Sequence, residues 1–67
     1  MNKYTEKLIL NEFTRHPHIS GNIISIIMKQ LDDYDKKNKF LSFMIDNRGI
    51  LLDKNDLVQQ LKILKEN

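Results

Sequence analysis

The stretch that decides the fold runs from residue 19 to residue 31 and reads ISGNIISIIMKQL. It opens with a helix start signal, because the Ser20 hydroxyl can accept a hydrogen bond from the amides that follow and Ile19 can pack on Ile24 as a hydrophobic staple. Apolar residues then recur at helical spacing, and they are Ile23, Ile24, Ile27, Met28, Leu31 and Tyr34. Ile26 widens their arc from about 140° to about 200°. An arc this wide predicts a central helix that other segments cover on two sides.

Two stretches leave a choice between helix and strand. Residues 23–28 are rich in isoleucine, which favours strands, but the helical period continues to Tyr34 and we therefore favour a helix. Residues 40–45 form either a helix that ends at Gly49 as a left-handed cap, or a strand that pairs with residues 50–52 across a loop at 47–49. We favour the helix here too, with the hairpin as the alternative.

The two ends of the chain predict one helix each. Over residues 3–15, apolar side chains recur at helical spacing until Pro17 stops the helix. Asp53 and Asp56 have the spacing of a capping box, and they precede a stripe of Leu57, Val58, Leu61 and Leu64 that predicts a helix over residues 54–66. Residues 32–39 are polar throughout and indicate either a connection or the frayed ends of two helices.

These segments predict one all-α domain over residues 1–67, a compact three- to four-helix bundle with room for a minimal β extension at residues 50–52. A chain of 67 residues buries only about 60% of its unfolded surface, so its own core supplies just a few kcal/mol. The sequence has no cysteine for a disulfide. We therefore expect a homodimer or a larger partner to add stability.

Composition limits the classes of protein further. Hydrophobic residues make up 40% of the chain and charged residues 30%, which is too apolar for disorder and too interrupted by charge for a membrane span. We expect a cytoplasmic protein, because the start of the sequence lacks a signal-peptide pattern and cysteine is absent. Alanine is absent as well, while Ile, Lys and Asn supply 25 residues, which suggests an AT-rich genome and a mobile element or phage.

The sequence carries little catalytic chemistry. Its histidines, His16 and His18, flank Pro17, and with Glu12 one turn earlier they form the best candidate for a metal site. We favour a helix terminus instead, because a structural zinc site normally needs four ligands. The serines have no convincing base beside them. We therefore expect no enzyme, no metal, no cofactor and no small-molecule substrate.

Two sets of apolar residues are candidates for a protein interface. Ile26 and Phe43 fall off the main stripes of their helices and would form an exposed patch. The leucines of the last helix would pair with those of a second copy. The predicted interface residues are therefore Ile26, Phe43, Leu57, Leu61 and Leu64.

The order of motifs from Leu8 to Leu52 gives a local resemblance. A turn at residues 16–20 leads into an Ile-rich helix, and residues 40–45 then close on Arg48-Gly49-Ile50-Leu51. This run resembles the helix-turn-helix core of winged-helix DNA-binding domains, although the connection at 32–38 is longer and a helix replaces the wing. The resemblance implies that the residues facing DNA are Lys36, Lys37, Asn38, Lys39 and Ser42.

Two hypotheses for function follow from the sequence. The leading one is a small non-enzymatic regulator or accessory subunit that binds a larger protein, in DNA replication, transcription or mobile-element biology. The alternative is a DNA-binding helix-turn-helix protein that dimerises through its last helix. We rank the protein-binding hypothesis first because the core is small and Ile26 and Phe43 fall off the main stripes of their helices. The net charge of +2 also gives no strong electrostatic attraction to nucleic acid.

Overall fold

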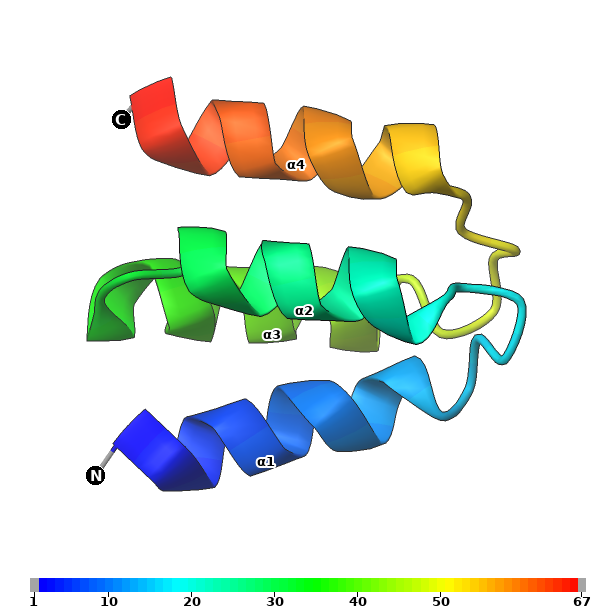
Figure 1. The fold of residues 1–67 in the computed structure, drawn as a ribbon, viewed down its shortest axis with the longest axis horizontal. Helices are drawn as coiled ribbons and strands as arrows, with labels where there is room; N and C mark the ends of the chain where they lie inside the picture. Colours follow the sequence, from blue (N-terminus) through cyan, green and yellow to red (C-terminus); the bar gives the residue numbers. More distant parts are fainter. Residues whose placement is uncertain (1, 67) are drawn as a thin grey trace.

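The computed structural model describes residues 2–66, which form four helices (Figure 1). They are α1 (Asn2–Phe13), α2 (Gly21–Gln30), α3 (Tyr34–Asp46) and α4 (Lys54–Glu66). These described residues contain no strand, so the prediction of an all-α bundle is confirmed. Residues 50–52 belong to the irregular connection between α3 and α4 and form no β extension. Within residues 2–66, no helix combines the length and the apolar character needed to cross a membrane.

The helices alternate in direction and form a bundle in which α1 and α4 lie on opposite sides (Figure 1). α2 and α3 occupy the space between these two outer helices. α1 packs on α3 most extensively and also on α2, whereas α4 packs on both α3 and α2. Each outer helix therefore covers both inner ones.

The core collects apolar side chains from all four helices and from both longer connections. Phe40 lies fully buried at its centre, with its ring 6.2 Å from that of Phe13 and 5.8 Å from that of Phe43, measured between centroids. The central helix expected from the sequence contributes Ile27, and Leu31 follows at its end. The buried apolar residues are Ile9, Phe13, Ile19, Ile27, Leu31, Phe40, Met44, Leu52, Leu57, Leu61 and Leu64.

Side-chain caps fix the starts of α2, α3 and α4. The Ser20 hydroxyl accepts a hydrogen bond from the Ile23 amide at 3.3 Å, as the sequence predicts. Asp53 and Asp56 form the predicted reciprocal box, in which each carboxylate accepts from the other residue's amide at 2.9 and 3.0 Å. α4 accordingly has the predicted bounds of 54–66.

The boundaries of α2 and α3 differ from the prediction. α2 ends at Gln30, and α3 already begins at Tyr34, because the Asp33 carboxylate accepts from the Lys36 amide at 2.8 Å and caps a new helix. Most of the polar stretch, predicted as a connection or as frayed helix ends, therefore belongs to the first turns of α3.

The end of α3 also differs from the prediction. Gly49 does not adopt the left-handed conformation that a glycine cap requires. Instead, the helix ends at Asn47, whose side-chain amide donates to the Phe43 carbonyl at 2.7 Å. The same carbonyl also accepts from the Asn47 backbone amide at 3.1 Å, so Asn47 caps the end of α3 through both its main chain and its side chain.

Candidate functional site

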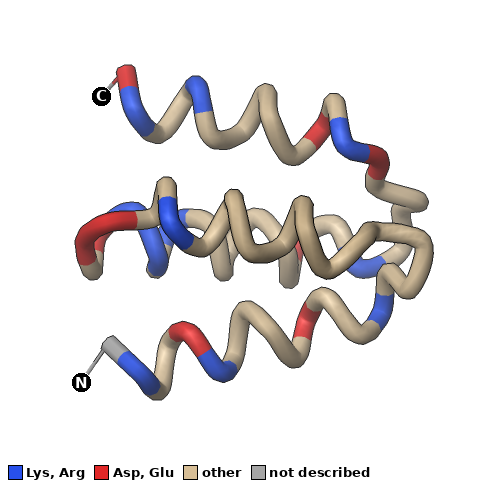
Figure 2. Tube along the Cα trace, in the orientation of Figure 1, with Lys and Arg blue, Asp and Glu red and all other residues tan. Residues whose placement is uncertain are grey.

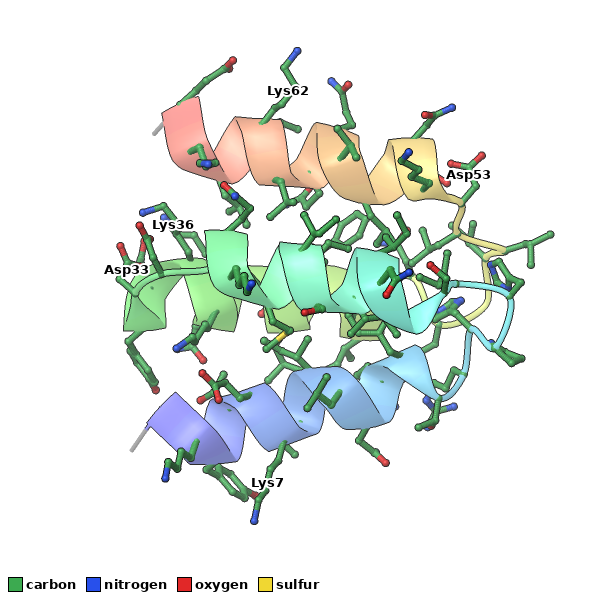
Figure 3. The ribbon with its side chains drawn as sticks, viewed as in Figure 1. Lys7, Asp33, Lys36, Asp53 and Lys62 are labelled. Carbon is green, nitrogen blue, oxygen red and sulfur yellow. The ribbon has the colours of Figure 1, made fainter. Side chains whose placement is uncertain are left out.

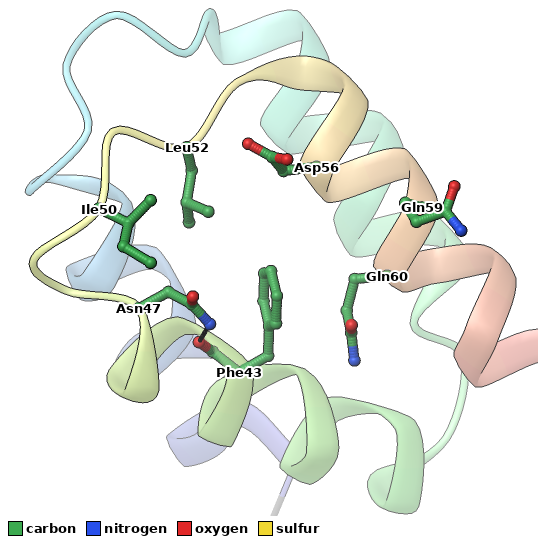
Figure 4. A pocket seen from close by; sticks show the side chains of 7 residues that line it. All are labelled: Phe43, Asn47, Ile50, Leu52, Asp56, Gln59 and Gln60. Atoms are coloured by element: carbon green, nitrogen blue, oxygen red, sulfur yellow. Dashed lines mark hydrogen bonds between the residues drawn. The ribbon is translucent and has the colours of Figure 1, made fainter.

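A groove lies between α3, α4 and the segment that joins them (Figure 4). Its volume is about 260 Å³. We call it the α3–α4 groove, and it is lined by Phe43, Asn47, Ile50, Leu52, Asp56, Gln59 and Gln60. Pockets that enclose a small-molecule ligand usually measure about 300–1,000 Å³, so this groove is better matched to part of a larger partner.

The floor of the groove is apolar. Phe43 points from α3 toward α4 in Figure 4, and its ring lies 5.8 Å from that of Phe40, measured between centroids. Leu52 is buried beside it, whereas Ile50 is 55% exposed and the neighbouring Leu51 is 79% exposed. These large apolar side chains lie in contact with water next to a preformed hollow, an arrangement typical of a binding surface.

The rim of the groove is polar and partly unpaired. The Asn47 amide and the Asp56 carboxylate are used in the local hydrogen bonds that end α3 and begin α4. In contrast, the side chains of Gln59 and Gln60 make no hydrogen bond to any residue that the structure describes. Each of these amides therefore offers a donor and an acceptor to a partner.

Two long-range links hold the segment that forms one wall of the groove. Arg48 donates from Nε to Glu12 Oε1 at 3.0 Å and from Nη2 to Glu12 Oε2 at 2.6 Å. His18 Nε2 donates to the Leu52 carbonyl. The wall is thereby tied to the end of α1 and to the α1–α2 connection, so the groove exists before any partner binds.

The Glu12 carboxylate is buried, yet it stays charged. Hydrogen bonds from Arg48 hold the pKa of Glu12 below its usual value, although burial alone would raise it. Glu12 in turn raises the pKa of Arg48. A second arginine, Arg15, approaches Glu12 at 3.4 Å from the same turn of chain. Glu12 is therefore the anchor that joins α1 to the segment after α3.

His16 is the second buried titratable group near this end of the bundle. It is 3% exposed, and its Nε2 atom has no hydrogen-bond partner among residues 2–66. Burial is the main cause that lowers the pKa of His16, and the charges of His18 and Arg15 lower it further. The charge of Glu12 raises the pKa but does not cancel these effects. The folded chain therefore favours a neutral imidazole at this position.

We expect acid to destabilise the chain through His16. Because the pKa of His16 is lower in the folded state, the unfolded state takes up a proton first as the pH falls below about 6.5, and the free energy of unfolding decreases from there. Urea unfolding followed by circular dichroism between pH 7.5 and 5.5 measures this. His16→Phe should flatten the pH dependence, while the control His18→Gln should keep most of it, because burial rather than the charge of His18 is the main cause of the lowered pKa of His16. An unchanged slope in His16→Phe would assign the acid sensitivity to another group.

The predicted interface residues lie in three different places in the structure. Phe43 forms the floor of the α3–α4 groove, whereas Ile26 lies 55% exposed on α2 and does not line the groove. The leucines of α4, by contrast, are buried in the core of their own chain, with Leu57, Leu61 and Leu64 at most 8% exposed. They pack against the rest of the bundle and present no dimer face.

The predicted DNA-facing lysines are already paired with carboxylates. Lys36 contacts Asp32 at 3.1 Å and Asp33 at 2.9 Å, and Lys39 contacts Asp35 at 3.0 Å. Figure 3 shows Lys36 beside Asp33 at the start of α3, and Figure 2 shows acidic and basic segments next to each other there.

The other residues expected on a DNA-facing surface divide between surface and core. Lys37 is buried, with Nζ 3.0 Å from Glu6, so it cannot reach a phosphate without breaking the packing of α1 on α3. Asn38 and Ser42 are exposed. This face of α3 therefore has little free positive charge.

The histidines are not arranged as a metal site. The rings of His16 and His18 lie edge to face with centroids 5.8 Å apart, but His18 Nε2 is bonded to the Leu52 carbonyl and Glu12 is bonded to Arg48. Among the residues that the structure describes, no three His, Cys, Asp or Glu side chains gather where they could hold a metal ion. These groups serve the fold instead.

Most of the groove was missed by the sequence analysis. Phe43 was identified by its position off the main stripe of its helix, but Asn47, Gln59 and Gln60 carry no local signal. The apolar run at residues 50–52 was interpreted as a candidate strand. Its signal as a binding surface is that it follows a helix end without the alternation of a half-buried strand.

No protein-family model matches this chain, and comparison with curated proteins and with solved structures finds no significant match. The function is therefore inferred from the groove and from the charges around it.

Proposed function

We propose that this chain is a small accessory or regulatory subunit that binds a larger protein through the α3–α4 groove. The observation that carries the proposal is the exposed apolar pair of Ile50 and Leu51 beside a hollow floored by Phe43. Burying such side chains against a partner removes apolar surface from water, at about 25 cal/mol per Å². A few well-packed apolar anchors of this kind commonly carry most of the affinity of an interface.

Direct binding to DNA has less support. Affinity for duplex DNA comes mainly from neutralising phosphates with free lysine and arginine side chains. Lys36 and Lys39 are paired with aspartates, and Lys37 is buried. A face of this kind offers phosphates few unpaired cations.

The proposal is tested by partner capture with two matched variants. Ile50→Asn removes an apolar side chain from the groove, and Ile26→Asn removes one of equal exposure, 55%, from α2. Affinity capture from the source cell, with and without nuclease and read by mass spectrometry, should recover a protein that Ile26→Asn retains and Ile50→Asn loses.

Two results would contradict the proposal. Loss of the partner with Ile26→Asn but not with Ile50→Asn would move the interface to α2. Capture that disappears after nuclease treatment would show that nucleic acid mediates it, in favour of the DNA-binding alternative. Circular dichroism of both variants checks that each remains folded, which we expect because both side chains are largely exposed.

A further inference from the structure

The size and floor of the α3–α4 groove suit one bulky apolar side chain. Its volume of about 260 Å³ is modest, and its floor is made by Phe43 and Leu52, with Ile50 at the edge. Anchor side chains at protein interfaces fill pockets of this kind, in which water is excluded from an apolar contact. The occupant therefore brings one such side chain.

The glutamines on the α4 side of the groove suit a peptide main chain. Gln59 and Gln60 are adjacent on α4, and neither side chain is hydrogen bonded to a described residue. A side-chain amide has both donors and an acceptor, which match the carbonyl and the N–H of a peptide group. A segment of polypeptide laid along α4 can satisfy both.

The stretch of sequence that supplies the lining of the groove, residues 43–60, carries more acidic than basic residues, although the chain as a whole has a net charge of +2. Between Phe43 and Gln60 the sequence carries three carboxylates, Asp46, Asp53 and Asp56, and Asp56 lines the groove itself. None of the three forms an ion pair with a residue that the structure describes. Of the two cations in the same span, Arg48 is paired with Glu12, which leaves Lys54. A partner with a positive charge is therefore favoured.

We infer that the α3–α4 groove binds a peptide segment of the partner that carries one bulky apolar side chain next to a lysine or arginine. The apolar side chain lies on Phe43, the main chain bonds Gln59 and Gln60, and the basic side chain faces Asp56. This inference rests on the proposed function and specifies the chemistry of the partner at the same site.

Selection of short random peptides displayed on phage tests this chemistry with the intact chain as the target. The enriched peptides should combine Leu, Met or Phe with a neighbouring Lys or Arg. One synthetic peptide from that set, titrated by calorimetry, should bind the wild type and lose about fivefold or more in affinity with Ile50→Asn and with Asp56→Asn. Asn at position 56 still provides a side-chain oxygen to accept from the Asp53 amide, so α4 keeps its cap. The control Ile26→Asn should bind as the wild type does.

Several outcomes would overturn the inference. These are enrichment of acidic peptides, binding that is indifferent to Ile50→Asn, and no enrichment at all. Sedimentation that shows a dimer abolished by Ile50→Asn would make a second copy of this chain the occupant instead. If partner capture still depends on Ile50 while peptide selection fails, the protein-binding function stands and the peptide chemistry is wrong. If Ile50→Asn also captures the partner as well as the wild type does, both the proposed function and the peptide inference are wrong.

Discussion

Replacing Phe40 with alanine is expected to unfold most of the chain at 25 °C. Phe40 is fully buried and touches the rings of Phe13 and Phe43. A buried Phe→Ala change costs about 3–5 kcal/mol, since it removes apolar contacts and leaves a cavity. A core of this size rarely supplies more than about 3–5 kcal/mol of stability. The cost of the substitution therefore equals the whole free energy of unfolding. Far-UV circular dichroism should therefore show loss of most helical signal.

An exposed aromatic residue provides the control for this prediction. Tyr4 lies on α1 and is 70% exposed, so Tyr4→Ala should stay within about 0.5 kcal/mol of the wild type in urea unfolding. A Phe40→Ala chain with the urea midpoint of the wild type would contradict the core described here. Phe40→Leu should fall between the two, because most of the apolar contact is retained.

The second large effect is expected at Arg48. Its two hydrogen bonds join the segment after α3 to Glu12, 36 residues earlier in the chain, and the Glu12 carboxylate they satisfy is 4% exposed. Arg48→Met keeps the aliphatic length of the side chain but leaves that buried carboxylate without its main partner, which is costly. The urea midpoint should therefore fall well below that of the wild type.

Arg15 offers a matched comparison, since it approaches the same carboxylate. Its contact is longer, at 3.4 Å, and local in sequence, so Arg15→Met should unfold close to the wild-type midpoint. In a Glu12→Gln background, the effect of Arg48→Met should shrink, because no buried charge is left unpaired. Equal effects of the two arginine changes would mean that the long-range link does not hold the wall of the groove.

Sequence patterns correctly predict those features of the fold that depend only on residues close together in the chain. The Ser20 cap and the Asp53–Asp56 box each need only three or four consecutive residues, and both are present in the structure. The same is true of α4, whose stripe of leucines needs only its own periodicity. Tyr4 shows the limit of this reasoning, because it continues the apolar spacing of α1 and yet is mostly exposed.

Apolar spacing leaves the start of α3 open between a connection and a frayed helix end, because its first turns are polar. The signal was present in the sequence, since Asp33 can cap and each of Asp32 and Asp35 precedes a lysine by four residues. These pairs form in the structure, Asp32 with Lys36 and Asp35 with Lys39. Charge spacing therefore indicated a helix where apolar spacing left the choice open.

The groove could not be predicted from the sequence as a whole site. Its walls depend on how α3 and α4 lie against each other and on a contact between Glu12 and Arg48. Neither depends on local spacing. Phe43 alone gave a signal, because its position off the main stripe of its helix indicated that its ring would not be fully enclosed.

The pairing of α1 with α3 affects how the molecule is made. During synthesis α1 emerges before α2, but the surface on which it packs most extensively belongs to α3. A nascent chain that ends at Gln30 thus leaves Phe13 without its contact to the aromatic ring of Phe40. We therefore expect no stable half-molecule on the ribosome, and the helices should assemble in one cooperative step after α3 has left the exit tunnel.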